Sequence, residues 1–177
     1  MKKIILIALS VVILTACAPK IENAANSTFT DKNNFNAQGK IALDCPKCDK
    51  YRCHNEPFSA AMNWQHQNQI DRLKFFDPMG AEVMQLEYQA NGKITLRDKK
   101  QTRELTVEEL AEEVGLTIPV KNTAHWLFEN RGGQAKFNAE NWSVETKNWQ
   151  ENGFYQRINL QQAQCKVKIF VEKVQGI

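Results

Sequence analysis

The cysteines are the residues of this chain whose chemistry and spacing call for an explanation first. Four of the 5 cysteines are Cys45, Cys48, Cys53 and Cys165. Cys45 and Cys48 form a Cys-x-x-Cys pair, and Cys53 follows with His54 next to it. Together they have the spacing expected for one half of a zinc site. A second Cys-x-x-Cys pair is missing, and no amphipathic helix follows the first, as a thioredoxin-like motif requires. Disulfide bonds in one of three pairings are the first interpretation, and a metal site is the alternative.

The fifth cysteine, Cys17, ends a segment of a different kind. Two lysines precede an apolar run over Ile4–Leu14, and Ala16 stands directly before Cys17. The run is shorter than the roughly 20 residues that a membrane-spanning helix needs. Its positive start, short apolar core and small residue before a cysteine look like a bacterial lipoprotein signal peptide. The pattern predicts removal of residues 1–16 and acylation of Cys17 as a lipid anchor.

A signal peptide implies that the protein is exported, and this has two further consequences. Ala18 follows the anchor cysteine, and in enteric bacteria an aspartate at that place favours retention in the inner membrane. The sequence therefore points to the outer membrane. The other four cysteines would lie in an oxidising compartment, where an even number favours two disulfides.

Catalytic motifs are the next question. The sequence contains no Gly-x-Ser-x-Gly, no His-Glu-x-x-His and no glycine-rich phosphate loop, and His54, His66 and His125 stand in unrelated contexts. The net charge of +3 falls to +1 when Lys2 and Lys3 leave with the signal (3 − 2 = 1), so charge gives no support to nucleic-acid binding. We expect no enzyme, no catalytic residue, no metal and no cofactor.

Strands dominate the pattern of the rest of the chain. Residues 17–34 are mostly polar and predict a tether behind the anchor, followed by one folded domain over residues 35–177. In this domain apolar and polar residues alternate, which is typical of strands with one buried face. The expected strands cover residues 36–43, 58–66, 70–76, 82–89, 92–97, 141–148, 153–160 and 165–173.

Two helical segments interrupt these strands. Thr106 and Glu109 have the spacing of a capping box, and Leu105, Leu110 and Val114 fall on roughly one side of the helix that follows. A second short helix is expected over residues 123–128. The second to fifth strands are joined by turns too short for a crossover helix, so they are antiparallel. An antiparallel sheet interrupted by helices is an α+β fold.

The apolar members of each alternating strand are candidates for either a packed core or a cavity wall. Most buried apolar residues only pack, so the alternation alone favours core for each of them. The candidates are Phe58, Ala60, Met62, Trp64, Leu73, Phe75, Met84, Leu86, Tyr88, Ile94 and Leu96 on strands, with Leu110, Val114, Leu127 and Phe128 on helices.

Met79 stands apart from this set because it lies in the turn Asp77-Pro78-Met79-Gly80. Pro78 fixes its own φ and Gly80 tolerates a positive φ, so the side chain between them tends to point outward. An apolar side chain there has no packing task unless it folds back onto the sheet.

Several segments, in this order, resemble the LolB family of outer-membrane lipoprotein receptors. Val114-Gly115-Leu116-Thr117-Ile118-Pro119-Val120 and the later Trp126-Leu127 are similar to the family's Leu-Gly-x-x-x-Pro-Val and Trp-Leu signature. The other matching segments are Phe35-Asn36-Ala37-Gln38-Gly39-Lys40-Ile41-Ala42, Phe58-Ser59-Ala60-Ala61-Met62-Asn63-Trp64-Gln65 and Asp77-Pro78-Met79-Gly80. With the lipid-anchor signal, the resemblance covers nearly the whole chain, and only the cysteines depart from it.

The resemblance implies both a fold and a function. The fold is an incomplete antiparallel β-barrel whose open side is covered by short helices around an apolar cavity. The function is to accept acylated lipoproteins from the periplasmic carrier LolA and insert them into the inner leaflet of the outer membrane, as a monomer without cofactor. The candidate residues above would then bind acyl chains, and Pro78, Met79 and Gly80 would form the membrane-insertion loop.

Two other classes of protein stay open from the residues alone. One is an envelope lipoprotein with a filled barrel that serves as a scaffold or assembly partner. The other is a periplasmic metal or redox module built on the cysteine insert. An apolar pocket between sheet and helices would argue against the first, and metal analysis would separate the second from disulfides.

Overall fold

The structure is a computed structural model that describes residues 32–48, 53–55, 57–114 and 118–177. The predicted anchor Cys17 and the predicted tether up to residue 31 lie outside these ranges. The elements are β1 (Asn34–Asp44), β2 (Pro46–Cys48), β3 (Cys53–Asn55), β4 (Phe58–Gln67), β5 (Ile70–Phe76), β6 (Glu82–Tyr88), β7 (Ile94–Asp98), β8 (Thr102–Leu105), α1 (Val107–Val114), α2 (Val120–Phe128), β9 (Ala135–Ala139), β10 (Trp142–Trp149), β11 (Tyr155–Gln162) and β12 (Cys165–Gly176).

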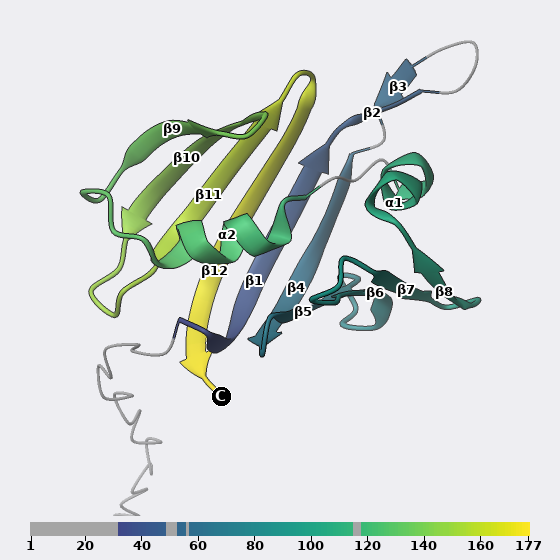
Figure 1. The fold of residues 1–177 in the computed structure, drawn as a ribbon, viewed down its shortest axis with the longest axis horizontal. Helices are drawn as coiled ribbons and strands as arrows, with labels where there is room; N and C mark the ends of the chain where they lie inside the picture. Colours follow the sequence, from purple (N-terminus) through teal and green to yellow (C-terminus); the bar gives the residue numbers. More distant parts are fainter. Residues whose placement is uncertain (1–31, 49–52, 56, 115–117) are drawn as a thin grey trace, which may run out of the picture.

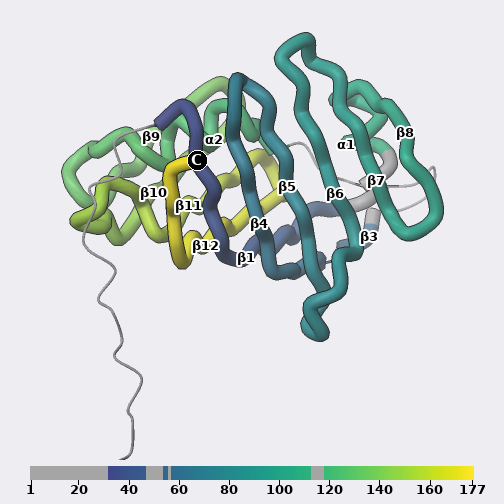
Figure 2. Tube along the Cα trace, turned by 90° about the horizontal axis from the view of Figure 1, so that it is seen from below, coloured from purple at the N-terminus to yellow at the C-terminus, as the bar shows by residue number. Residues whose placement is uncertain are grey.

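One large antiparallel sheet carries the fold. In the described part of the chain it has 10 strands in the order β8-β7-β6-β5-β4-β1-β12-β11-β10-β9. Strands β8 and β9 end the sheet at opposite edges, so the sheet is open, and Figure 2 shows that it is strongly curved. An open, curved antiparallel sheet with two short helices fits the incomplete barrel that the sequence predicts.

The inner face of the sheet is apolar because the alternation places it there. In β1, Phe35, Ala37, Gly39, Ile41 and Leu43 are buried, and the residues that alternate with them are half-buried or exposed. Gly39 continues this inner row at a register shift between β1 and β12, where a Cβ would lie 1.9 Å from the Phe170 carbonyl oxygen. Only glycine fits that close approach of two backbones.

The helices cover part of this inner face. Figure 1 shows α2 lying across β11, β12 and β1, whereas α1 lies near the β8 edge. Leu127 and Phe128 of α2 are buried, and the Phe128 ring meets Phe35 of β1 edge-to-face at 4.9 Å between centroids. The two helices therefore close over different parts of the sheet, and the space between them is the place to look for a cavity.

Some elements differ from the sequence prediction. The insert over residues 44–57 contains the hairpin β2–β3, and β8 and β9 were not predicted. Leu105, assigned to the first helix, is the last residue of β8, and α2 begins at Val120 instead of residue 123. β8 has four residues and no apolar alternation, whereas in β9 the half-buried Ala135, Phe137 and Ala139 alternate with exposed polar residues, so β9 carried a strand pattern that the prediction missed.

The capping box at the start of α1 forms as predicted. The Glu109 backbone N–H donates to Thr106 Oγ1 at 3.2 Å, and the Thr106 N–H donates to Glu109 Oε2 at 2.7 Å. These bonds satisfy two donors that a helix start otherwise leaves without partners.

Thr106→Ala removes one of these bonds, and we expect it to lower the free energy of unfolding by about 1 kcal/mol. Thr102→Ala, at an exposed strand position, is the matched control and should change it by less than about 0.5 kcal/mol. Urea unfolding of the full chain, followed by circular dichroism, measures both. Equal losses in the two variants would contradict the capping role.

Candidate functional site

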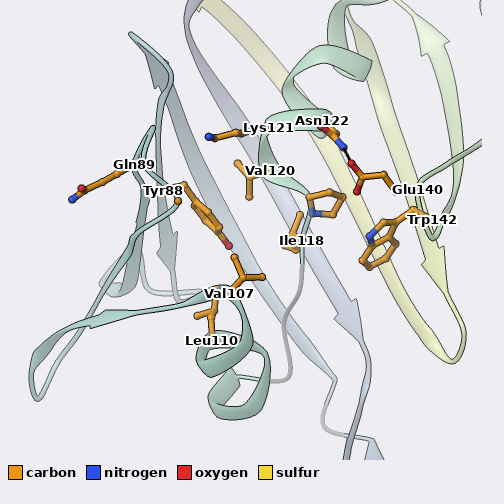
Figure 3. A pocket seen from close by; sticks show the side chains of 12 residues that line it. Tyr88, Gln89, Val107, Leu110, Ile118, Val120, Lys121, Asn122, Glu140 and Trp142 are labelled. Carbon is orange, nitrogen blue, oxygen red and sulfur yellow. Dashed lines mark hydrogen bonds between the residues drawn. The ribbon is translucent and has the colours of Figure 1, made fainter.

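A cavity of about 340 Å³ lies between the sheet and the two helices. This volume is at the small end of the range for ligand pockets. Its lining is mostly apolar, and Figure 3 shows the side chains of β6, α1, α2 and β10 around it. The lining residues are Tyr88, Gln89, Gly92, Val107, Leu110, Ile118, Pro119, Val120, Lys121, Asn122, Glu140 and Trp142.

Polar contacts hold α2 against both sides of this cavity. Asn122 Nδ2 donates to Glu140 Oε1 at 2.8 Å, which ties the helix to the turn between β9 and β10. Lys121 Nζ donates to the Ala90 carbonyl at 3.4 Å, which ties it to the turn between β6 and β7. Both contacts are exposed, so α2 is held on the sheet mainly by its buried side chains, among them Leu127 and Phe128.

The predicted cavity residues divide into two groups. Tyr88 and Leu110 line the cavity. The side chain of Val114 is outside the described residues. All the others belong to the packed core or pack against it: Phe58, Ala60, Met62, Trp64, Leu73, Phe75, Met84, Leu86, Ile94, Leu96, Leu127 and Phe128. The alternation identified the buried face but could not tell packing from cavity lining, because the helices decide where the face is left uncovered.

Five apolar lining residues were missed. They are Val107 at the start of α1, Ile118, Pro119 and Val120 at the start of α2, and Trp142 at the start of β10. The signal that could have found them is the segment Ile118–Val120, where apolar residues immediately precede a helix. Trp142 also alternates with the buried Val144.

A buried polar network lies next to the cavity on the inner face. Asp71 of β5 is fully buried, and its Oδ1 accepts a hydrogen bond from Trp64 Nε1 at 2.8 Å and lies 2.7 Å from His66 Nδ1. Tyr88 of β6 is the direct cross-strand neighbour of Asp71. Burial, and to a smaller extent the Asp71 carboxylate, raises the pKa of the Tyr88 hydroxyl. Tyr88 therefore stays protonated at neutral pH.

Met79 points away from the protein, as the turn chemistry predicts. Its exposed fraction is 91%. Asp77 Oδ1 accepts the backbone N–H groups of Met79 and Ala81, each at 2.9 Å, and Gly80 has φ 82°. The backbone of the turn is thus fixed by Asp77 and Gly80, and the Met79 side chain contributes nothing to its conformation.

The cysteines are divided between two places. A disulfide joins Cys45, directly after β1, to Cys165, the first residue of β12. Cys48 and Cys53 are opposite each other in the β2–β3 hairpin, and their side chains are outside the described residues. No group of three or more metal-ligating side chains occurs in the part of the chain that the structure describes.

None of the described helices is long and apolar enough to cross a membrane. The N-terminal residues 1–18 match the family of prokaryotic membrane lipoprotein lipid attachment sites.

Known proteins are similar to most of this chain. Residues 33–173 match the family described as outer membrane lipoprotein LolB. The outer-membrane lipoprotein LolB of Aggregatibacter actinomycetemcomitans is 27% identical over 151 residues, which are 79% of this chain and 70% of that protein.

Two further relatives carry the same name. That of Haemophilus influenzae strain 86-028NP is 24% identical over 72% of this chain and 64% of its own length. That of Shewanella sp. strain W3-18-1 is 24% identical over 79% of this chain and 71% of its own length. The chain therefore belongs to the LolB family of outer-membrane lipoproteins, which serves lipoprotein localization.

Proposed function

We propose that this chain is anchored through acylated Cys17, receives acylated lipoproteins from the carrier LolA, and inserts them into the outer membrane. The observation that carries the proposal is the mostly apolar cavity between the open sheet and its two helices. No catalytic step is assigned to the chain.

The energetics of the cargo explain why such a cavity is needed. Each buried CH₂ contributes about 0.8 kcal/mol, so exposing one 16-carbon chain to water costs about 12 kcal/mol. A receptor must cover that surface during transfer but must release it to the membrane without ATP. A small cavity suits both demands, since it covers part of an acyl chain and binds it more loosely than a bilayer does.

The exposed Met79 turn supports the second half of the proposal. The β5–β6 turn projects from the end of the sheet opposite the β6–β7 turn, which borders the cavity (Figure 2). Receipt and insertion would therefore use separate parts of the molecule.

An acyl chain with a bromine label tests the cavity directly, because bromine quenches tryptophan fluorescence on contact. We expect methyl dibromostearate to quench the full chain, purified in alkyl maltoside, and Trp142→Phe to remove most of that quenching. Trp149→Phe is the matched control, since Trp149 packs on Tyr155 and is not among the lining residues.

A second variant tests the same site by blocking it. Val107 lines the cavity and is 42% exposed, so Val107→Glu should fold, and it should weaken quenching by about tenfold because a carboxylate resists desolvation. Val107→Leu should bind as the parent does. Quenching that is insensitive to Trp142→Phe and Val107→Glu would favour the scaffold alternative, an envelope lipoprotein without a lipid cavity.

A further inference from the structure

The β7–β8 turn is a second projection beside the turn that carries Met79. Lys99 and Lys100 form its tip, and both are exposed. Figure 2 shows that the two turns project in the same direction from the sheet, and that the β5–β6 turn reaches farther. In the strand order β8-β7-β6-β5, two strand spacings separate the centres of the turns, which is about 10 Å.

The register of the sheet gives the difference in height between the two turns. Met84 of β6 is opposite both Phe75 of β5 and Asp98 of β7, so these three residues lie at one level. From this level the chain runs four residues to Met79 in one turn and one residue to Lys99 in the other. The Met79 backbone therefore lies about three residue steps, or about 10 Å, beyond the tip of the β7–β8 turn.

Asp98 fixes the backbone of the β7–β8 turn. Its Oδ1 accepts the backbone N–H groups of Lys100 at 2.7 Å and Gln101 at 3.0 Å, and its Oδ2 accepts Arg103 Nη2 at 3.1 Å. The carboxylate is thus occupied, and neither lysine side chain has an ion pair or hydrogen bond with a described residue. Both lysines can therefore bind an external anion.

The surrounding charges leave this corner of the molecule positive. Lys74 pairs with Glu82 at 3.2 Å at the base of the β5–β6 turn, and Arg103 pairs with Asp98, so these four charges cancel. The exposed Arg97 and the two lysines of the turn remain against Asp77. An anionic surface is the complementary partner.

A membrane offers suitable chemistry at the depth of each turn. Its polar headgroup layer is about 5–8 Å thick on each side of the hydrocarbon. When the Met79 side chain reaches the hydrocarbon, the tip of the β7–β8 turn stands about 10 Å higher, at the outer edge of the headgroups. The long lysine side chains then extend among the lipid phosphates, well within the Debye length of about 8 Å over which an anionic lipid surface attracts a cation.

We propose that Lys99 and Lys100 bind the phosphate groups of anionic phospholipids while Met79 is inserted, so that the two turns dock the protein on the membrane together. This inference rests on the proposed function, because it takes Met79 as the residue that enters the membrane. Contact at Met79 alone leaves the protein free to tilt. A second contact about 10 Å to the side sets the direction in which the β5–β6 turn enters.

Acetylation of lysines by a membrane-impermeant succinimide ester measures this contact without cargo. The full chain is reconstituted through its anchor into liposomes of phosphatidylcholine alone or of an equal mixture with phosphatidylglycerol, and mass spectrometry reads each lysine. We expect Lys99 and Lys100 to react about tenfold more slowly on the anionic liposomes, and high salt to remove the difference. Lys166 and Lys168 are exposed lysines of β12, three strands from β5, and should react equally on both.

A double variant tests whether the contact assists insertion. Lys99→Gln with Lys100→Gln should slow delivery of lipoprotein into the anionic liposomes about tenfold, and should leave delivery into phosphatidylcholine liposomes and receipt from LolA unchanged. Lys166→Gln with Lys168→Gln removes the same charge elsewhere and should deliver at the parent rate. All four positions are exposed, so both variants should melt as the parent does.

Three outcomes overturn the inference. The first is equal acetylation of Lys99 and Lys100 on the two kinds of liposome. The second is impaired receipt from LolA in the Lys99 and Lys100 variant, which would make an acidic carrier protein the partner of the turn. The third is equal slowing by the β12 variant, which would show an effect of net charge alone. If the parent neither receives nor delivers lipoprotein, the proposed function fails, and acetylation still decides whether the turn contacts the membrane.

Discussion

Met79→Glu is expected to leave receipt of acylated cargo from LolA almost unchanged and to slow its delivery into liposomes about tenfold to a hundredfold. The reason is the cost of placing a carboxylate in the hydrocarbon, about 2.5–3.5 kcal/mol for a charged side chain at the bilayer centre and less near the surface. Transfer of radiolabelled lipoprotein from its LolA complex, first to the protein and then to liposomes, measures the two steps separately.

The geometry explains why the two steps should separate. Met79 is 91% exposed, and its turn is fixed by Asp77, so the substitution disturbs no packing. Tyr88, at the cavity, lies at the far end of the seven-residue strand β6, about 20 Å away at the rise of an extended chain. The proposal that Met79 acts in membrane insertion would therefore be contradicted if Met79→Glu changed the receipt of cargo from LolA. It would be contradicted equally if Met79→Glu delivered cargo to liposomes at the normal rate.

Two controls accompany this experiment. Met79→Leu should deliver at the parent rate, because both side chains are apolar and similar in volume. Ile177→Glu makes the same apolar-to-acidic change at another exposed position, with an exposed fraction of 56%, and should have no effect. Equal melting temperatures establish that all variants are folded. If Met79→Glu delivered cargo at the parent rate, Met79 would have no role in insertion and would be an ordinary turn residue.

The proposed anchoring through Cys17 also requires that residues 17–34 be long enough for Met79 to reach the membrane. The chain enters the sheet at Asn34, whereas β5 ends at Phe76, which lies opposite Ala61 and so at the level of Lys40 of β1. These six residue steps are about 20 Å, and the protruding turn that carries Met79 adds about 10 Å. The 17 residues from Cys17 to Asn34 (34 − 17) span at most about 60 Å, which is sufficient. Deleting ten of them leaves a reach of about 25 Å and should impair delivery as Met79→Glu does.

Replacing Cys45 and Cys165 together by alanine is expected to lower the free energy of unfolding by about 2–5 kcal/mol and the Tm by about 5–20 °C. This disulfide joins residues that are 120 apart in sequence. Closing so long a loop restricts the unfolded chain strongly, which destabilises it relative to the folded chain. The bond also ties together the ends of β1 and β12, two central strands of the sheet. Thermal unfolding with and without reductant measures the effect.

The pair Cys48 and Cys53 provides the matched control. These residues face each other across a short hairpin, so if they form the second predicted disulfide it closes a small loop. In the chain-entropy model its removal costs only about 2 kcal/mol, against about 5 for the long loop. Titration of the unfolded, non-reduced protein should find almost no free thiol. Four reactive thiols, or a stoichiometric zinc ion, would contradict the disulfide interpretation.

Local patterns in the sequence determined most of the sheet. Strands β4, β5 and β10 could be predicted because the pleat turns their alternating residues toward and away from the buried face. The capping box of α1 and the outward direction of Met79 depend on backbone rules that act within four residues. The edge strand β8 escaped prediction because its four residues show no apolar alternation, and the β2–β3 hairpin because each of its strands has only three residues.

The site itself depended on tertiary structure. Trp64, Leu86 and Tyr88 have the same place in the alternation, yet only Tyr88 lines the cavity. The difference arises because α1 and α2 cover some of the inner face and leave the rest open, and their positions follow from contacts between residues far apart in sequence. The same holds for Cys45 and Cys165: their number predicted disulfides, but only the pairing of β1 with β12 brought these two together, because sequence spacing carries no information about which distant strands become neighbours.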